Sequence, residues 1–153
     1  MIHAMHIAAL DETKAMMERV EASQTDASDL ASKIESLELV ANYRDFGNLC
    51  GRECQFLDFH HNSEDTQVFP LVSAKGDDSL RRVVDRLTQE HTIVHELLVD
   101  LDRHVRAIAR DPSSKTFAAA QRTFELLYKF VRSHFGYEEG ELEEALGFFE
   151  VPL

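Results

Sequence analysis

The sequence predicts an all-α protein, folded as an antiparallel up-down-up-down four-helix bundle. Apolar residues recur at helical spacing in four long segments, and short polar loops separate these segments. No segment alternates between apolar and polar residues as a half-buried strand does. Long amphipathic helices with short connections pack as antiparallel neighbours. The chain has 153 residues, so we expect a single domain over residues 1–153.

The first half of the chain contains two predicted helical regions. The first covers residues 2–22, and its apolar face consists of His6, Leu10, Met17 and Val20. After a polar stretch, the second region runs from residue 29 to about residue 68. Gly47 and Gly51 weaken its middle, so we expect a bend or break there. Pro70 indicates that this region ends nearby.

The second half contains the other two predicted helices. A loop at residues 75–79 precedes the third helix, residues 80–110, and Pro112 marks the turn after it. The inner face of this helix consists of Val84, Leu87, His91, Val94, His95, Leu98, Leu101 and Asp102. The fourth helix covers residues 116–146. Its inner face consists of Phe117, Phe124, Leu127, Val131, His134 and Glu138.

The charge of the chain narrows the classes of partner. The formal net charge is −12, which argues against nucleic acid or an anionic membrane as a partner. The sequence shows no signal peptide and no apolar run long enough to span a membrane. We therefore expect a cytoplasmic protein.

Metal-binding side chains recur in pairs that are spaced by one helical turn. The pairs are His60–Glu64, His91–His95 and His134–Glu138. Residues at positions i and i+4 of a helix have Cβ atoms about 5–6 Å apart, so each pair can direct two side chains at one point. One such pair is usually a surface contact, and a single core histidine is usually only hydrogen-bonded. Recurrence on three helices favours a common site.

These side chains occupy positions at which the apolar faces require core residues. A carboxylate without a partner is costly to bury, and a bound cation offsets that cost. We therefore expect a metal centre in the core of the bundle. Imidazole and carboxylate ligands without thiolate suit iron or manganese, with zinc as an alternative. Carboxylates from two helices indicate a site for two metal ions.

The chain resembles the hemerythrin-like (HHE cation-binding) domain family in three segments. These are HHNSEDTQVFP, EHTIVHELL and HFGYEEGEL, of which the first is the most specific. The resemblance implies a non-haem centre of two iron ions, oxo- or hydroxo-bridged, with histidine ligands and bridging carboxylates. It also implies an open position for O2 or another small diatomic or peroxide ligand.

The resemblance further implies which residues bind the metal. The implied ligands are His6, His60, Glu64, His91, His95, His134 and Glu138. Two alternatives stay open, His3 in place of His6 and Glu139 in place of Glu138. His61 is interpreted as a surface residue or a neighbour of the ligands, with a ligand role as the minority reading.

The function that follows is binding or sensing of O2, or sensing of iron or redox state, with no residue assigned a catalytic role. The alternative is a di-iron enzyme that handles peroxide or nitric oxide, or an iron-donating stress-response protein. The predicted pocket walls are apolar and offer no obvious general base. This favours binding or sensing over turnover.

Overall fold

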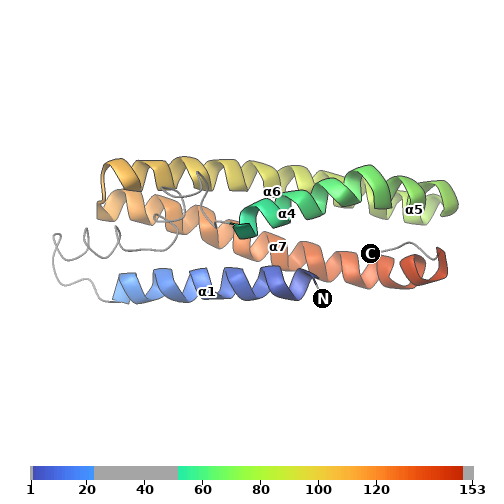
Figure 1. Ribbon diagram of the computed structural model, residues 1–153, viewed down its shortest axis with the longest axis horizontal. Helices are drawn as coiled ribbons and strands as arrows, with labels where there is room; N and C mark the ends of the chain where they lie inside the picture. The colour runs from blue at the N-terminus through green and yellow to red at the C-terminus, as the bar shows by residue number, and fades with distance from the viewer. Residues whose placement is uncertain (1, 23–51, 150–153) are drawn as a thin grey trace.

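The computed structural model describes residues 2–22 and 52–149, and every regular element in these two ranges is helical. The prediction of an all-α chain is therefore confirmed. Residues 29–51 of the second predicted region, including the expected bend at Gly47 and Gly51, lie outside the described residues. The described helices lie side by side along one long axis (Figure 1). None of them combines enough length and apolar character to span a bilayer.

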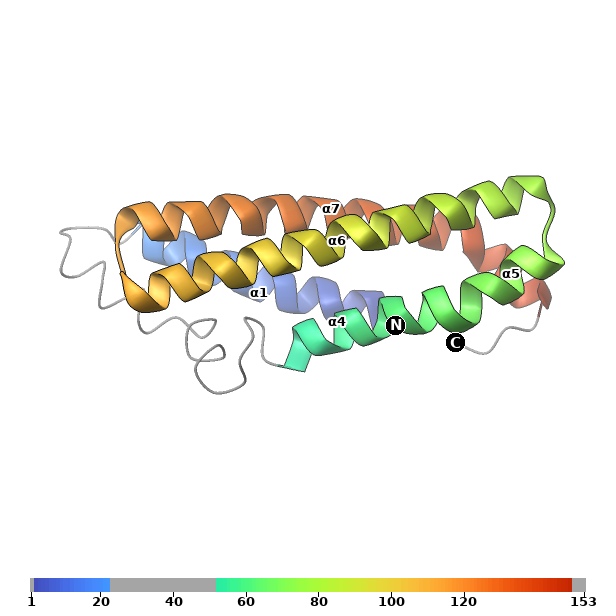
Figure 2. The same ribbon diagram turned by 90° about the horizontal axis from the view of Figure 1, so that it is seen from above.

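Six helical elements make up the described chain. They are α1 (Ile2–Ala22), α4 (Arg52–Ser63), η1 (Glu64–Val68), α5 (Phe69–Lys75), α6 (Asp78–Arg110) and α7 (Ser114–Phe149). The elements α4, η1 and α5 follow one another without a break and form one curved rod (Figure 2). The two long helices α6 and α7 run in opposite directions and make the most extensive pairing (Figure 1).

The rod formed by α4, η1 and α5 does not end near residue 68, as the sequence predicts, but continues to Lys75. The reason is a π-helical turn, in which the Phe69 N–H donates to the carbonyl oxygen of Glu64, five residues earlier. Pro70 is the second residue of α5, within its first turn. A proline costs little there, because the first N–H groups of a helix have no partner within it.

The turn between α5 and α6 is shorter than the predicted loop. Gly76 ends α5, and a Cβ atom there would lie only 2.8 Å from the carbonyl oxygen of Val72. The next residue, Asp77, caps α6, because its carboxylate accepts hydrogen bonds from the N–H groups of Ser79 and Leu80 at 2.9 Å each. Helix α6 therefore starts two residues before the predicted position.

The bundle core consists of two apolar clusters with a polar layer between them. The larger cluster contains Leu10, Met17, Val20, Leu57, Val94, Leu101, Val105, Ile108, Phe117, Ala120, Phe124, Leu127, Val131 and Phe135. The smaller cluster contains Phe69, Val72, Val84, Leu87 and Leu142. Along α6, His91 lies between Leu87 of the smaller cluster and Val94 of the larger one. The histidines and carboxylates thus replace one layer of core side chains.

Candidate metal centre

The polar layer contains six buried side chains that can bind a metal. They are His6, His61, Glu64, His91, His134 and Glu138. Each helical rod supplies at least one of them, so the layer crosses the whole bundle. Within this layer, two groups of donor atoms converge, and within each group all donor atoms lie within 4.8 Å of one another.

The three-histidine group consists of His61 on α4, His91 on α6 and His134 on α7. All three imidazoles are buried. The Nε2 atoms of His91 and His134 lie 3.1 Å apart, and the ring of His61 stacks on that of His91 with centroids 4.0 Å apart. The Nε2 atom of His61 is buried and has no hydrogen-bond partner.

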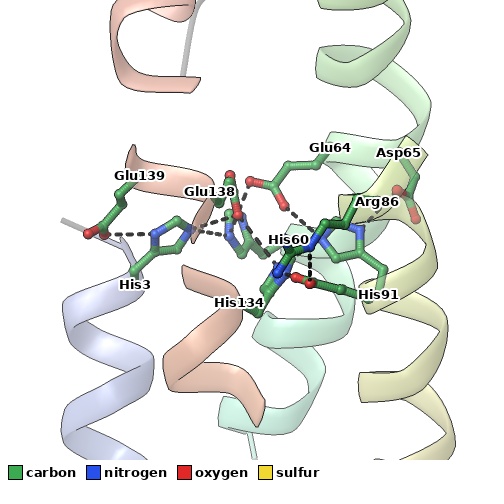
Figure 3. Close-up of polar contacts among 10 residues, drawn as sticks. His3, His60, Glu64, Asp65, Arg86, His91, His134, Glu138 and Glu139 are labelled. Atoms are coloured by element: carbon green, nitrogen blue, oxygen red, sulfur yellow. Dashed lines mark hydrogen bonds and ion pairs between the residues drawn. The ribbon is translucent and has the colours of Figure 1, made fainter. Parts of the chain in front are cut away.

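The two-histidine, two-glutamate group consists of His3 on α1, His60 on α4, Glu64 on η1 and Glu138 on α7. The Nε2 atoms of His3 and His60 lie 3.0 Å apart. The His60 Nε2 atom is 3.3 Å from Glu64 Oε1, and the His3 Nε2 atom is 3.6 Å from Glu138 Oε2. Figure 3 shows these side chains pointing toward one another between the helices.

The two glutamates lie between the groups and reach both of them. Glu64 directs Oε1 toward His60 of one group, and its other oxygen, Oε2, is 3.5 Å from His91 Nε2 of the other. Glu138 Oε2 is 3.6 Å from the Nε2 atom of His134 as well as from His3. The Oε2 atoms of both glutamates are buried without a hydrogen-bond partner. A carboxylate in this position can bridge two cations.

Burial makes the charged forms of four of these side chains unfavourable when no cation is present. It raises the pKa of Glu64 to about 10, and the negative charge of Glu138 adds to the effect. Burial likewise lowers the pKa of His60 and of His91 to about 3 each, with further repulsion from His3 and His134 respectively. The pKa of His61 is lowered in the same way. Without a cation, Glu64, His60, His61 and His91 are therefore held in their neutral forms.

The hydrogen bonds of His91 and His134 show that the site suits a cation. His91 Nδ1 lies 2.9 Å from Asp65 Oδ1, and His134 Nδ1 lies 3.0 Å from Glu90 Oε2, both within hydrogen-bond distance. The Nε2 atoms of the two rings face one another inside the centre, 3.1 Å apart. Two nitrogens bound about 2.1 Å from one metal ion at right angles lie roughly 3 Å apart. A shared cation fits this separation.

Two of the residues predicted as ligands lie outside both groups. The side chain of His95 is 65% exposed and contacts Asp58 at the surface, 3.5 Å away. The buried seam of α6 passes through His91 and Val94, which turns His95 toward solvent. His6 is buried and its ring lies 5.8 Å from that of His60, but its Nε2 atom has no partner and it joins neither group.

His3 and His61 take part in the groups instead. His3 is the open alternative on the first helix, one turn before His6, where α1 lies beside Glu138 and Glu139 of α7. Glu139 contacts only the outer nitrogen of His3, whereas Glu138 faces the interior. A signal for His61 exists in the sequence, because Leu57, His61 and Glu64 are spaced by four and then three residues and all are buried.

Comparison with known proteins identifies one family. The family model described as hemerythrin HHE cation binding domain matches residues 2–146, which include both groups. Searches of the curated proteins and of the solved structures found no match to the chain.

Proposed function

The chain belongs to the hemerythrin HHE cation-binding family, and we propose that it holds two iron ions and binds or senses O2. The three-histidine group would hold one ion, and His3 and His60 the other, with Glu64 and Glu138 shared between them. Imidazole and carboxylate donors suit iron or manganese, with zinc as an alternative. The proposal includes an antiparallel up-down-up-down arrangement of the four helical rods.

Iron(II), when bound, supplies the electrons that allow a site of this kind to hold O2 or to report its presence. The chain's own contribution begins with the two glutamates. Each has a buried oxygen without a hydrogen-bond partner, and the pKa of Glu64 is raised to about 10 without a cation. A nearby positive charge lowers the pKa of a carboxyl group, so cation binding and loss of the Glu64 proton are coupled.

Aromatic rings line the polar layer and limit the access of water. Phe135 stacks on His3 with ring centroids 4.0 Å apart, and Phe69 stacks on His91 with centroids 5.3 Å apart. Both phenylalanines are buried, one in each apolar cluster. Apolar walls of this kind suit a small uncharged ligand and keep proton donors away from it. They support binding or sensing of O2 rather than turnover.

The observation that carries the proposal is the pair of facing nitrogens in His91 and His134. Two carboxyl groups, those of Asp65 and Glu90, lie within hydrogen-bond distance of the outer nitrogens of these rings. The inner nitrogens of the two rings lie 3.1 Å apart in the buried layer. Burying the polar nitrogens of His91 and His134 side by side costs free energy, and a cation bound between them offsets that cost.

The test is an anaerobic titration of the chelator-treated protein with iron(II). We expect about two iron ions per chain for the natural sequence, as in other carboxylate-bridged bundles. His91→Ala should lose at least one of them. His104→Ala, which changes a histidine of the same helix outside both groups, should retain both. Failure of the natural protein to retain any transition metal would rule out the proposed centre.

Exposure of the iron-loaded protein to O2 separates the two functional classes. A visible absorption change that reverses when O2 is removed supports binding or sensing. Continuous consumption of O2, peroxide or nitric oxide over many cycles supports the alternative, a di-iron enzyme. Release of iron on exposure supports the iron-donating role.

A further inference from the structure

Three histidines of the centre place their outer nitrogen within hydrogen-bond distance of a carboxyl group on a neighbouring element. His91 Nδ1 is 2.9 Å from Asp65 Oδ1, and His134 Nδ1 is 3.0 Å from Glu90 Oε2. In the same way, His3 Nδ1 is 2.9 Å from Glu139 Oε1. In each case the other ring nitrogen, Nε2, faces the interior of the centre (Figure 3).

Each of these carboxylates is the sequence neighbour of a residue in one of the two groups. Asp65 follows Glu64, Glu90 precedes His91, and Glu139 follows Glu138. The hydrogen bonds therefore link η1 to α6, α6 to α7, and α7 to α1. On α6, for example, His91 belongs to the three-histidine group, and the preceding residue, Glu90, contacts His134 of α7.

We propose that Asp65, Glu90 and Glu139 are positioning residues that set the tautomer of His91, His134 and His3 before a cation enters. An ionised carboxylate only accepts hydrogen bonds, so it keeps the imidazole proton on Nδ1 and leaves the Nε2 lone pair directed inward. Partners of this kind also fix the ring orientation and raise the basicity of metal-bound histidines. This inference rests on the proposed function for the identity of the inner groups.

The surroundings of the carboxylates predict an order of importance. The side chain of Glu90 is 14% exposed, that of Asp65 33% and that of Glu139 60%. Glu90 is also held from the other side, because Arg86 Nε donates to its Oε1 at 2.8 Å. The Arg86 guanidinium lies over the ring of Tyr137, 3.7 Å from its centroid. Replacing Glu90 should therefore change the tautomer and the metal affinity most, and replacing Glu139 should change them least.

The first test follows the ring protons in the metal-free, ¹⁵N-labelled full chain by NMR. We expect His134 to carry its proton on Nδ1 in the natural protein. Glu90→Ala should move that proton toward Nε2, the site that neutral histidine favours in water, and should leave His3 unchanged. Glu96→Ala, which removes an exposed carboxylate from the same helix, is the matched control and should change neither ring.

The second test measures cobalt(II) affinity in competition with a chelator. Loss of a partner of this type weakens metal binding about 10–100-fold, so we expect this loss for Glu90→Ala and a smaller one for Glu139→Ala. Glu90→Gln keeps an acceptor oxygen without the charge. This variant should preserve the His134 tautomer and bind cobalt(II) with an affinity between those of the natural protein and Glu90→Ala. It replaces Glu90→Ala in both tests if the alanine variant does not fold.

The proposal is overturned if His134 carries its proton on Nε2 in the natural protein, or if Glu90→Ala leaves both tautomer and affinity unchanged. A protein that takes up cobalt(II) as expected but neither retains iron nor responds to O2 would refute the proposed function alone. The tautomer result is obtained without metal and decides the role of the carboxylates in either case.

Discussion

Replacing Glu64 with glutamine should stabilise the metal-free protein while weakening its metal binding. Glu64 lies in the polar layer with 8% of its side chain exposed, and burial is the main cause that raises its pKa to about 10. The folded metal-free protein therefore keeps this carboxyl group protonated at neutral pH, whereas the unfolded chain ionises it. Glutamine is neutral in both states and has nearly the same shape.

The magnitude follows from the two pKa values. A carboxyl group with a raised folded-state pKa costs stability above its unfolded value of 4.5, until the pH reaches the folded value of about 10. Each pH unit in this window costs about 1.4 kcal/mol, so the cost at pH 7 is about 3 kcal/mol. Glu64→Gln should recover most of it. For a domain of this size, this corresponds to a rise of about 6–12 °C in Tm.

The assay is urea unfolding of the chelator-treated protein, followed by circular dichroism at pH 6, 7 and 8. The difference in the free energy of unfolding between Glu64→Gln and the natural protein should grow by about 1.4 kcal/mol per pH unit. Glu96→Gln, an exposed change on α6, should show no comparable trend. In the presence of cobalt(II), the natural protein should gain more stability than Glu64→Gln, because the variant has lost a charged ligand.

Two results would refute this reasoning. One is a Glu64→Gln variant that is no more stable than the natural protein at any of the three pH values. The other is a gain in stability that does not depend on pH, because removal of an ionisable group must produce the slope. Either result would mean that Glu64 is not forced into its neutral form in the metal-free core.

Three further predictions test the site and the core. His95→Ala should leave metal content and Tm unchanged, as measured by metal analysis and calorimetry, because 65% of its side chain is exposed. Acidification should destabilise the metal-free protein below pH 6.5. In the unfolded chain His60 and His91 take up protons below pH 6.5, whereas in the folded protein they do so only near pH 3. The free energy of unfolding, measured with urea, should therefore fall by up to about 1.4 kcal/mol per pH unit for each of these histidines. Phe124→Ala should cost about 3–5 kcal/mol in the same assay, because Phe124 is fully packed in the larger apolar cluster.

The helices and their buried faces could be predicted because both depend on local order in the sequence. Apolar spacing along α6 and α7 placed Leu87, His91, Leu127 and His134 on inner faces, and all four are buried. The same spacing indicated that polar side chains replace core residues in one layer. The predicted end of the second helical region, near residue 68, was wrong, because the π-helical turn of η1 accommodates Pro70 and the rod continues to Lys75. Such a turn leaves no mark in the apolar periodicity.

The sequence by itself determined that this chain is all-helical and that histidines and glutamates enter its core. These properties follow from residue type and spacing within single helices. Only the tertiary structure decided which side chains converge. It brings His3 and His61 into the groups and leaves His6 and His95 outside them. It also places Asp65 and Glu90 behind His91 and His134. The physical reason is that the rotation and axial position of each helix depend on packing against its neighbours, so spacing along one helix does not fix which of its histidines faces the centre.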